Sequence, residues 1–300
     1  MAMKFALTIG GLCLATLSAA TAQGQPAANM SPSAKPKVYA LVAAIGDEFS
    51  IVSENMNVFS HIEHIHFSRR SRTAPDDLLN RLALASLDKA VARLEPDSKR
   101  IYLQFGMPRV DGIAASKRED AVLAIIQSQL RDIPERRQWD RILVATPAYR
   151  LFDHEGLAVS SGNMTRLQGF GVFTQPATGG ESESFGGKPF RQHAISPDRK
   201  EVKSETFIAP FSYVEIWVLD ARDLSVIDKQ TRFDHQKLAD PLSGSMDVNQ
   251  SVPREFLARH VRGVIEGSIQ EAVMQSKMND RRGVVEVGPI APVTAGGDKK

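Results

Sequence analysis

The order of apolar and polar residues along the chain predicts strands that alternate with helices. Residues 38–45 (VYALVAAI) form a continuous apolar run, which is typical of a strand covered on both faces. Further strands are predicted at residues 99–105 and 141–146, with helical periodicity over residues 75–94 and 116–133 between them. This strand–helix–strand–helix–strand order predicts right-handed crossovers onto a partly parallel sheet.

Two further features refine the first half of this pattern. Gly46-Asp47 separates the first apolar run from a second short one, residues 49–52, and this spacing predicts a hairpin. A third extended segment is predicted at residues 58–67. Ser116 followed by Glu119 indicates where the second helix begins.

The second half of the chain predicts an antiparallel addition to this sheet. Residues 213–219 (YVEIWVL) form the clearest strand, residues 224–231 return beside it, and a last helix opens at Pro253. A Gly- and Ser-rich stretch within residues 176–206 predicts a mobile loop. The fold expected is α/β, bordering on α+β: a single domain over residues 38–278 with a mixed, partly parallel sheet flanked by helices.

The amino-terminal residues predict export from the cytoplasm. Lys4 precedes the apolar run of residues 5–17, and small residues ending at Ala22 follow it, which is the order of a secretory signal peptide. We therefore expect a signal peptide over residues 1–22, a flexible linker over residues 23–37 and a disordered tail over residues 279–300. After cleavage the chain is expected to be periplasmic or secreted, with no transmembrane segment.

Composition narrows the chemistry that such a protein can carry. The 300 residues hold 37 Lys and Arg against 35 Asp and Glu, and this near-balance gives no electrostatic reason to expect nucleic acid as a partner. The one cysteine, Cys13, lies inside the predicted signal peptide and follows Leu12, where a lipoprotein signal needs a small residue. A mature chain without cysteine has no disulfide, thiolate metal site or cysteine nucleophile. No cofactor is predicted.

Three short motifs contain residue types that occur at catalytic or metal sites. His64 and His66, two apart on a strand, face the same side and can share an ion, but His61 faces away and no carboxylate pattern accompanies them, so no metal site is predicted. Gly46-Asp47 followed by Glu48 resembles the nucleophile turn of the SGNH hydrolases. That turn requires a serine where Glu48 stands, so an SGNH active site is not predicted. Gly169-x-Gly171 lacks the third glycine of a dinucleotide fingerprint.

One edge of the predicted sheet is the candidate ligand site. Ligands collect beyond the carboxyl ends of parallel strands, and the residues expected there are Asp47, Glu48, Thr146, Tyr149 and Arg150. An arginine at this position clamps an anion, and the tyrosine stacks or donates a hydrogen bond. The alternative is that these are ordinary turn residues with surface charges.

The order of elements resembles the periplasmic α/β domain of the TolB amino-terminal part, the curli secretion proteins and the penicillin-binding-protein activators. Residues 38–45 resemble its opening strand, residues 141–145 its central strand, and residues 213–227 its late hairpin. The resemblance implies a non-catalytic module that docks onto envelope proteins. The function expected is therefore binding or assembly in the bacterial cell envelope, and the alternative is a periplasmic hydrolase, phosphoesterase or small-anion-binding protein that uses the strand-end edge.

Overall fold

The computed structural model describes residues 35–56, 65–106, 110, 112–149, 152–154, 165–175, 192–243 and 252–279. The described residues from Pro36 onward belong to one compact unit. The strands are β1 Val38–Ala43, β2 Glu48–Met56, β3 Ile65–Thr73, β4 Lys99–Gln104, β5 Arg141–Pro147, β6 Phe152–His154, β7 Thr165–Leu167, β8 Phe170–Gln175, β9 Gln192–Ile195, β10 Glu201–Ser204, β11 Phe207–Asp220 and β12 Val226–His235. The helices are α1 Leu78–Leu94, α2 Ala115–Arg131, α3 Arg254–Gln275 and two 3₁₀ turns, η1 Pro134–Gln138 and η3 Lys277–Asn279.

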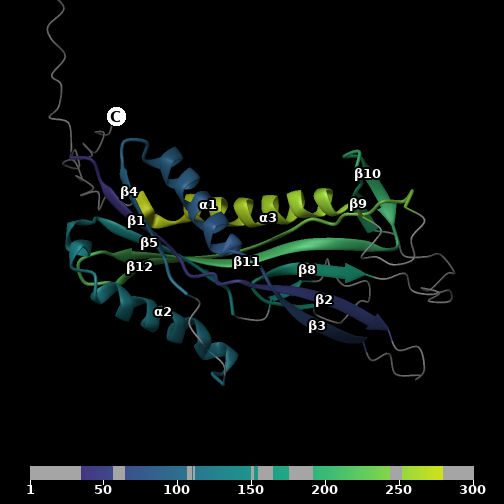
Figure 1. Cartoon of the computed structure of the whole chain (residues 1–300), viewed down its shortest axis with the longest axis horizontal. Coiled ribbons are helices and arrows are strands. Elements are labelled where there is room, and N and C mark those ends of the chain that lie inside the picture. The colour runs from purple at the N-terminus through teal and green to yellow at the C-terminus, as the bar shows by residue number, and fades with distance from the viewer. Residues whose placement is uncertain are drawn as a thin grey trace, which may run out of the picture. The chain divides into compact units, whose positions relative to one another are not determined.

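The main sheet has eight strands and mixes parallel with antiparallel pairs (Figure 1). β1 lies between β4 and β5 and is parallel to both, which confirms the three-strand parallel core that the apolar runs predict. β11 joins this core through an antiparallel pairing with β5, and β12 returns along its other edge. The fold is thus a single α/β domain with a mixed sheet.

The long strand β11 links two groups of strands. Residues 207–212 pair with β8, and residues 214–220 pair with β5. Since β12 occupies the opposite edge of β11, β8 and β5 lie end to end along one edge of it. The first group is β4, β1 and β5, and the second is β8, β2 and β3.

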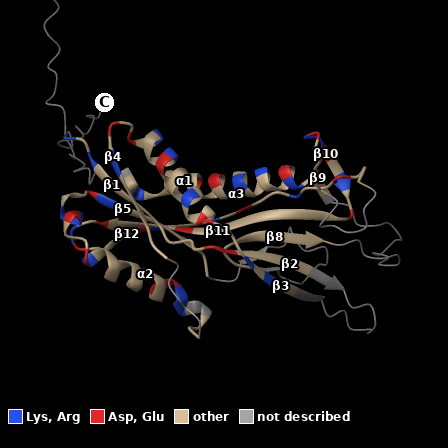
Figure 2. Cartoon of the chain, viewed as in Figure 1, with Lys and Arg blue, Asp and Glu red and all other residues tan. Residues whose placement is uncertain are grey.

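Helices cover both faces of the sheet (Figure 1). Alternate side chains of β1 point to opposite sides, as a strand requires. Tyr39, Leu41 and Ala43 pack with α1 and α3, whereas Ala40 and Val42 pack with α2. Figure 2 shows acidic and basic residues spread along the helices, while β11 carries only Glu215 and Asp220.

The predicted hairpin at Gly46-Asp47 is wrong, because β1 and β2 do not pair. Instead the chain crosses from the first group of strands to the second, and β2 pairs with β8 in parallel and with β3 antiparallel. Gly46 has a φ of 80°, a left-handed value that suits glycine. The buried Asn80 side chain fixes the crossing by accepting hydrogen bonds from the backbone N–H groups of Ile45 and Gly46, at 2.9 and 3.2 Å.

Two other segments differ in extent from the sequence prediction. The third strand, predicted at residues 58–67, continues to Thr73, because its partner β2 begins at Glu48 and the two strands pair from Ile65 to Thr73. Residues 57–64 lie outside the described residues. Within the segment predicted as a loop, β9 and β10 form an antiparallel pair, whereas residues 176–191 lie outside the described part of the chain.

Candidate functional site

The predicted strand-end residues occupy two different environments. Asp47 and Glu48 are exposed at the start of β2. Thr146 and Tyr149 are 1% and 6% exposed and face the α2 side of the sheet. Arg150 lies outside the described residues, so its expected role as an anion clamp stays a prediction.

The end of β5 is enclosed because β8 begins where β5 stops. The backbone N–H of Ala148 donates to the carbonyl of Tyr213 at 3.0 Å, and that of Tyr213 donates to Gly169 at 2.7 Å. Gln168 donates its side-chain amide to the carbonyl of Tyr149. This closure packs Thr146 and Tyr149 into the interior, beside residues that the sequence reasoning did not select.

A buried charged cluster lies beside these two residues. Lys229 on β12 extends its ammonium between Glu119 of α2, at 2.7 Å, and Glu215 of β11, at 2.8 Å. Both carboxylates are buried, at 3% and 1% exposed. The same ammonium lies 4.4 Å from the centre of the Trp217 ring, whose N–H donates to the Thr146 hydroxyl at 3.2 Å. We name Glu119, Glu215 and Lys229 the buried charge cluster.

Electrostatics in this region favour the protonated forms of Glu215 and Tyr149. Burial raises the pKa of Glu215 to about 7, against the opposing effect of Lys229 and with a further increase from Glu119. Burial also raises the pKa of Tyr149, and the carboxylates of Glu215 and Glu48 add to the increase. The Tyr149 hydroxyl is buried and has no hydrogen-bond partner among the described residues.

Glu215→Gln should remove a pH dependence of stability. Between about pH 4.5 and 7 the native Glu215 keeps a proton that an unfolded chain loses, so the free energy of unfolding should fall as pH rises, by at most about 1.4 kcal/mol per pH unit. Urea unfolding of both proteins across this range measures the effect. An equal slope in the variant would contradict the assignment.

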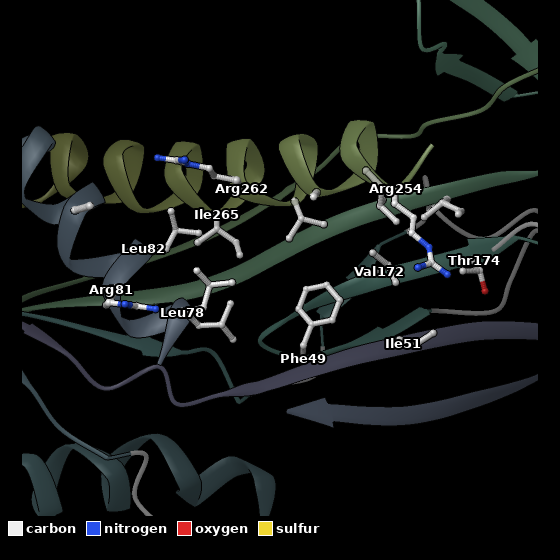
Figure 3. A pocket seen from close by; sticks show the side chains of 16 residues that line it. Phe49, Ile51, Leu78, Arg81, Leu82, Val172, Thr174, Arg254, Arg262 and Ile265 are labelled. Atoms are coloured by element: carbon white, nitrogen blue, oxygen red, sulfur yellow. The ribbon is translucent and has the colours of Figure 1, made fainter. Parts of the chain in front are cut away.

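A second candidate site lies on the opposite face of the sheet. Here a groove with a volume of about 690 Å³ runs between α1, α3 and the sheet (Figure 3). Its floor consists of Phe49 and Ile51 from β2, Val172 and Thr174 from β8, and Ile208 from β11. We name this space the apolar groove. Its volume falls within the range of small-molecule sites, about 300–1,000 Å³.

The groove exists because α1 runs obliquely to α3, so that their first turns lie apart (Figure 1). α3 has 22 residues and α1 has 17. They touch through the later part of each, where Lys89 pairs with Glu266 and Arg93 contacts Met274. The first turns of α3 therefore extend over β2 and β8 beyond the start of α1, where α1 does not cover the floor.

The walls of the groove present apolar side chains that remain partly open to solvent. Leu82 on α1 and Leu257 and Val261 on α3 are half-buried, and Leu78 at the start of α1 is 49% exposed. Exposing apolar surface is unfavourable, and an apolar concavity of this kind is the usual form of a ligand site.

The charged side chains along the groove are all arginines. Arg81, Arg254 and Arg262 line it, and no acidic residue does. Arg262 is paired with Glu266 at 2.7 Å. Within the described part of the chain, neither Arg81 nor Arg254 has an ion-pair partner within 4.0 Å.

Sequence reasoning missed both the charge cluster and the groove, although each has a local signal. Glu215 is a lone carboxylate inside an apolar strand, which predicts a buried partner. Glu119 was interpreted as part of a helix start, but α2 begins at Ala115 and Glu119 points to Lys229. Leu257 and Val261 are spaced along the last helix so that one apolar stripe lies beside arginines, but a stripe of this kind usually marks core packing.

Among the described residues, no group of three or more His, Cys, Asp or Glu side chains is placed to hold a metal ion. His61 and His64 and the side chain of His66 fall outside the described residues. Of the helices that the structure describes, none combines the length and apolar character needed to cross a bilayer.

Comparisons with known proteins give distant structural likenesses. No family model and no curated protein matches the chain. A Xanthomonas campestris protein of the DUF330 family is similar at 12% identity and a TM-score of 0.27, over 80% of this chain and 83% of that chain. Lipoprotein GNA1162 of Neisseria meningitidis is similar at 9% identity and a TM-score of 0.26, over 77% of this chain and 97% of that one.

A third solved structure is similar to the same extent. It is a homologue of a neuraminyllactose-binding hemagglutinin from Helicobacter pylori, at 9% identity and a TM-score of 0.29, over 82% of this chain and 84% of that one. Likenesses this distant carry no functional conclusion. The resemblance to the TolB, curli and penicillin-binding-protein activator domains therefore stays a prediction.

Proposed function

We propose that the protein is an exported, non-catalytic binding protein of the cell envelope, and that the apolar groove holds its ligand, a small molecule with a hydrocarbon part. The observation that carries the proposal is a concave space of about 690 Å³ whose walls and floor are largely apolar and partly exposed. A small apolar ligand would bury these side chains, and the release of water from them favours binding.

The groove also fits a small molecule better than a catalytic role. Its lining contains three arginines and one threonine as polar residues, without a carboxylate, histidine or cysteine. Acid–base and nucleophilic catalysis need a group that exchanges a proton or forms a covalent bond near neutral pH, and arginine stays protonated. The chemistry supported at this site is therefore binding.

Location in the envelope follows from the sequence prediction of a signal peptide over residues 1–22. A compartment bounded by membranes holds many molecules with hydrocarbon chains, which is consistent with an apolar ligand site. Proteins of the envelope remain the partners that we propose for delivery or receipt of such a ligand.

Filling the groove should abolish binding of an apolar probe. Ala85 on α1 and Ala258 on α3 line the groove and are exposed, so a tryptophan at either position has room to enter the groove without disturbing the core. We expect the mature protein to raise the fluorescence of N-phenylnaphthylamine, and Ala85→Trp and Ala258→Trp to lose that increase.

A matched control separates groove filling from the effect of any new surface tryptophan. Ala124 is also exposed on a helix, but on α2 across the sheet, so Ala124→Trp should bind the probe as the parent does. If all three variants bind the probe like the parent, or if the parent does not bind it, the groove is not the ligand site.

A further inference from the structure

The charges around the apolar groove have one sign, and this restricts the ligand beyond the requirement for a hydrocarbon part. Of the residues that line the groove, three are arginines and none is acidic. Arginine remains cationic at every physiological pH and recognises carboxylate and phosphate groups through paired N–H donors. The charged side chains that a ligand meets among the lining residues are therefore all cationic.

The three arginines differ in whether an acidic side chain already pairs with them. Arg262 shares its charge with Glu266, which Lys89 also contacts at 3.2 Å. Arg81 and Arg254 have no ion-pair partner within 4.0 Å among the described residues. An anionic group thus gains most from these two, because it need not displace a carboxylate.

The two unpaired arginines differ in their surroundings. Arg254 begins α3, and its guanidinium extends toward the end of the groove where Thr174 and Val172 lie (Figure 3). Val252, just before α3, and Phe256 in its first turn belong to the same hydrophobic cluster as Val172 of β8, which places this end of α3 over that strand.

Arg81 lies at the other end of the groove, beside side chains of α1 (Figure 3). Its closest lining neighbours along the helix, Leu78, Leu82 and Ala85, are apolar. The aliphatic stem of Arg81 can cover this apolar surface while its guanidinium stays in water. This end of the groove therefore suits the hydrocarbon tail of a ligand.

We propose that the ligand is an anionic amphiphile whose acidic headgroup pairs with Arg254 and whose hydrocarbon chain lies along the apolar groove toward Leu78. This inference rests on the proposed function and adds the charge and orientation of the ligand. The hydrocarbon chain of the ligand contacts Phe49, Val261 and Ile265 in the middle of the groove. The headgroup remains at the rim, where its charge stays hydrated.

The test compares two ligands that differ only in charge, as competitors of bound N-phenylnaphthylamine. Palmitate should displace the probe from the mature protein at about tenfold lower concentration than methyl palmitate, since an ion pair at a partly exposed site contributes about one factor of ten. Raising the salt concentration should weaken palmitate and leave the ester unchanged.

Arginine variants locate the headgroup. Arg254→Gln should weaken palmitate about tenfold, Arg81→Gln and Arg262→Gln by about twofold or less, and none should change methyl palmitate. Arg131→Gln is the matched control, because Arg131 is exposed in the last turn of α2, across the sheet. It should leave both ligands unaffected.

The outcomes distinguish the failure of this inference from that of the proposed function. Equal affinity for palmitate and its ester, or an unchanged palmitate affinity in Arg254→Gln, overturns the anionic headgroup and leaves the groove as an apolar site. Absence of probe binding overturns both proposals. So does a protein that is dimeric by light scattering and becomes monomeric on Ala258→Trp, since the groove then belongs to a second copy of the chain.

Discussion

Lys229→Met should lower the free energy of unfolding by about 3–5 kcal/mol at pH about 8.5, above the pKa of Glu215, because it removes the cation that both buried glutamates contact. Lys229 contacts both Glu119 and Glu215, and each of these is at most 3% exposed. Methionine replaces the volume of the lysine stem but supplies no charge. Urea unfolding followed by circular dichroism measures the loss.

The pH dependence of this variant identifies the cause. Acid protonates Glu215, whose pKa lies at about 7, and removes its need for a cation, so Lys229→Met should lose less stability at pH about 5 than at pH about 8.5. A loss that is equal at both pH values would show that packing, including the contact of Lys229 with Trp217, is the cause.

An exposed ion pair supplies the control. Lys200 pairs with Asp198 at 2.7 Å, but their side chains are 78% and 56% exposed. Solvent and salt screen such exposed pairs, so Lys200→Met should change stability little. A comparable loss in both lysine variants would contradict the burial argument.

Gly171→Ala should be the most damaging change in the second group of strands. A Cβ at this position would lie 2.1 Å from the backbone carbonyl oxygen of Ser50 and 2.8 Å from Cζ of Phe211. The carbonyl belongs to β2, which pairs with β8 at this residue, so β2 must move away. We expect a loss of about 3 kcal/mol or more.

The same substitution should reach the apolar groove, because β2 supplies Phe49 and Ile51 to its floor. Any Gly171→Ala protein that folds should therefore bind N-phenylnaphthylamine more weakly than the parent. Binding and stability are measured on the same samples. Parent-like values of both would show that β2 adapts without cost.

A glycine in an open position is the matched control for this clash. Gly263 lies inside α3, and a Cβ there meets nothing within 4 Å. Alanine is the better helix former, so Gly263→Ala should raise the free energy of unfolding by about 0.5–1 kcal/mol. The two Gly→Ala changes thus predict opposite signs.

Local sequence was sufficient for the elements of the first group of strands. The apolar run of residues 38–45 and the periodic residues of α1 and α2 are buried by contacts that any layered α/β fold must make. The pattern alone therefore identified the parallel core of β4, β1 and β5 and the helices that cover it.

The strand that pairs with the segment after Gly46-Asp47 could not be predicted from local sequence. Gly46-Asp47 permits a sharp change of direction, and a hairpin is the commonest use of such a pair. In the structure this turn instead joins β1, which pairs with β5, to β2, which pairs with β8. The side chain of Asn80 from α1 holds the turn. That outcome depends on a residue of a later helix.

Some residues of the candidate site could be predicted from local sequence, and others could not. The strand-end rule selected Thr146 and Tyr149, and the structure places both beside the buried charge cluster. It did not select Lys229 or Glu119, because these residues approach Glu215 only after β12 and α2 have packed. A carboxylate in an apolar strand indicates a buried partner but does not identify it.

The sequence by itself determined the strands and helices, the parallel core and the predicted export signal, because each follows from residues close together in the chain. Only the tertiary structure decided that β8 and β5 share one edge of β11 and that α3 extends beyond the start of α1 over β2 and β8. The apolar groove results from this second arrangement. Its floor and walls come from five separate parts of the chain, and packing between distant segments rather than local periodicity sets their spacing.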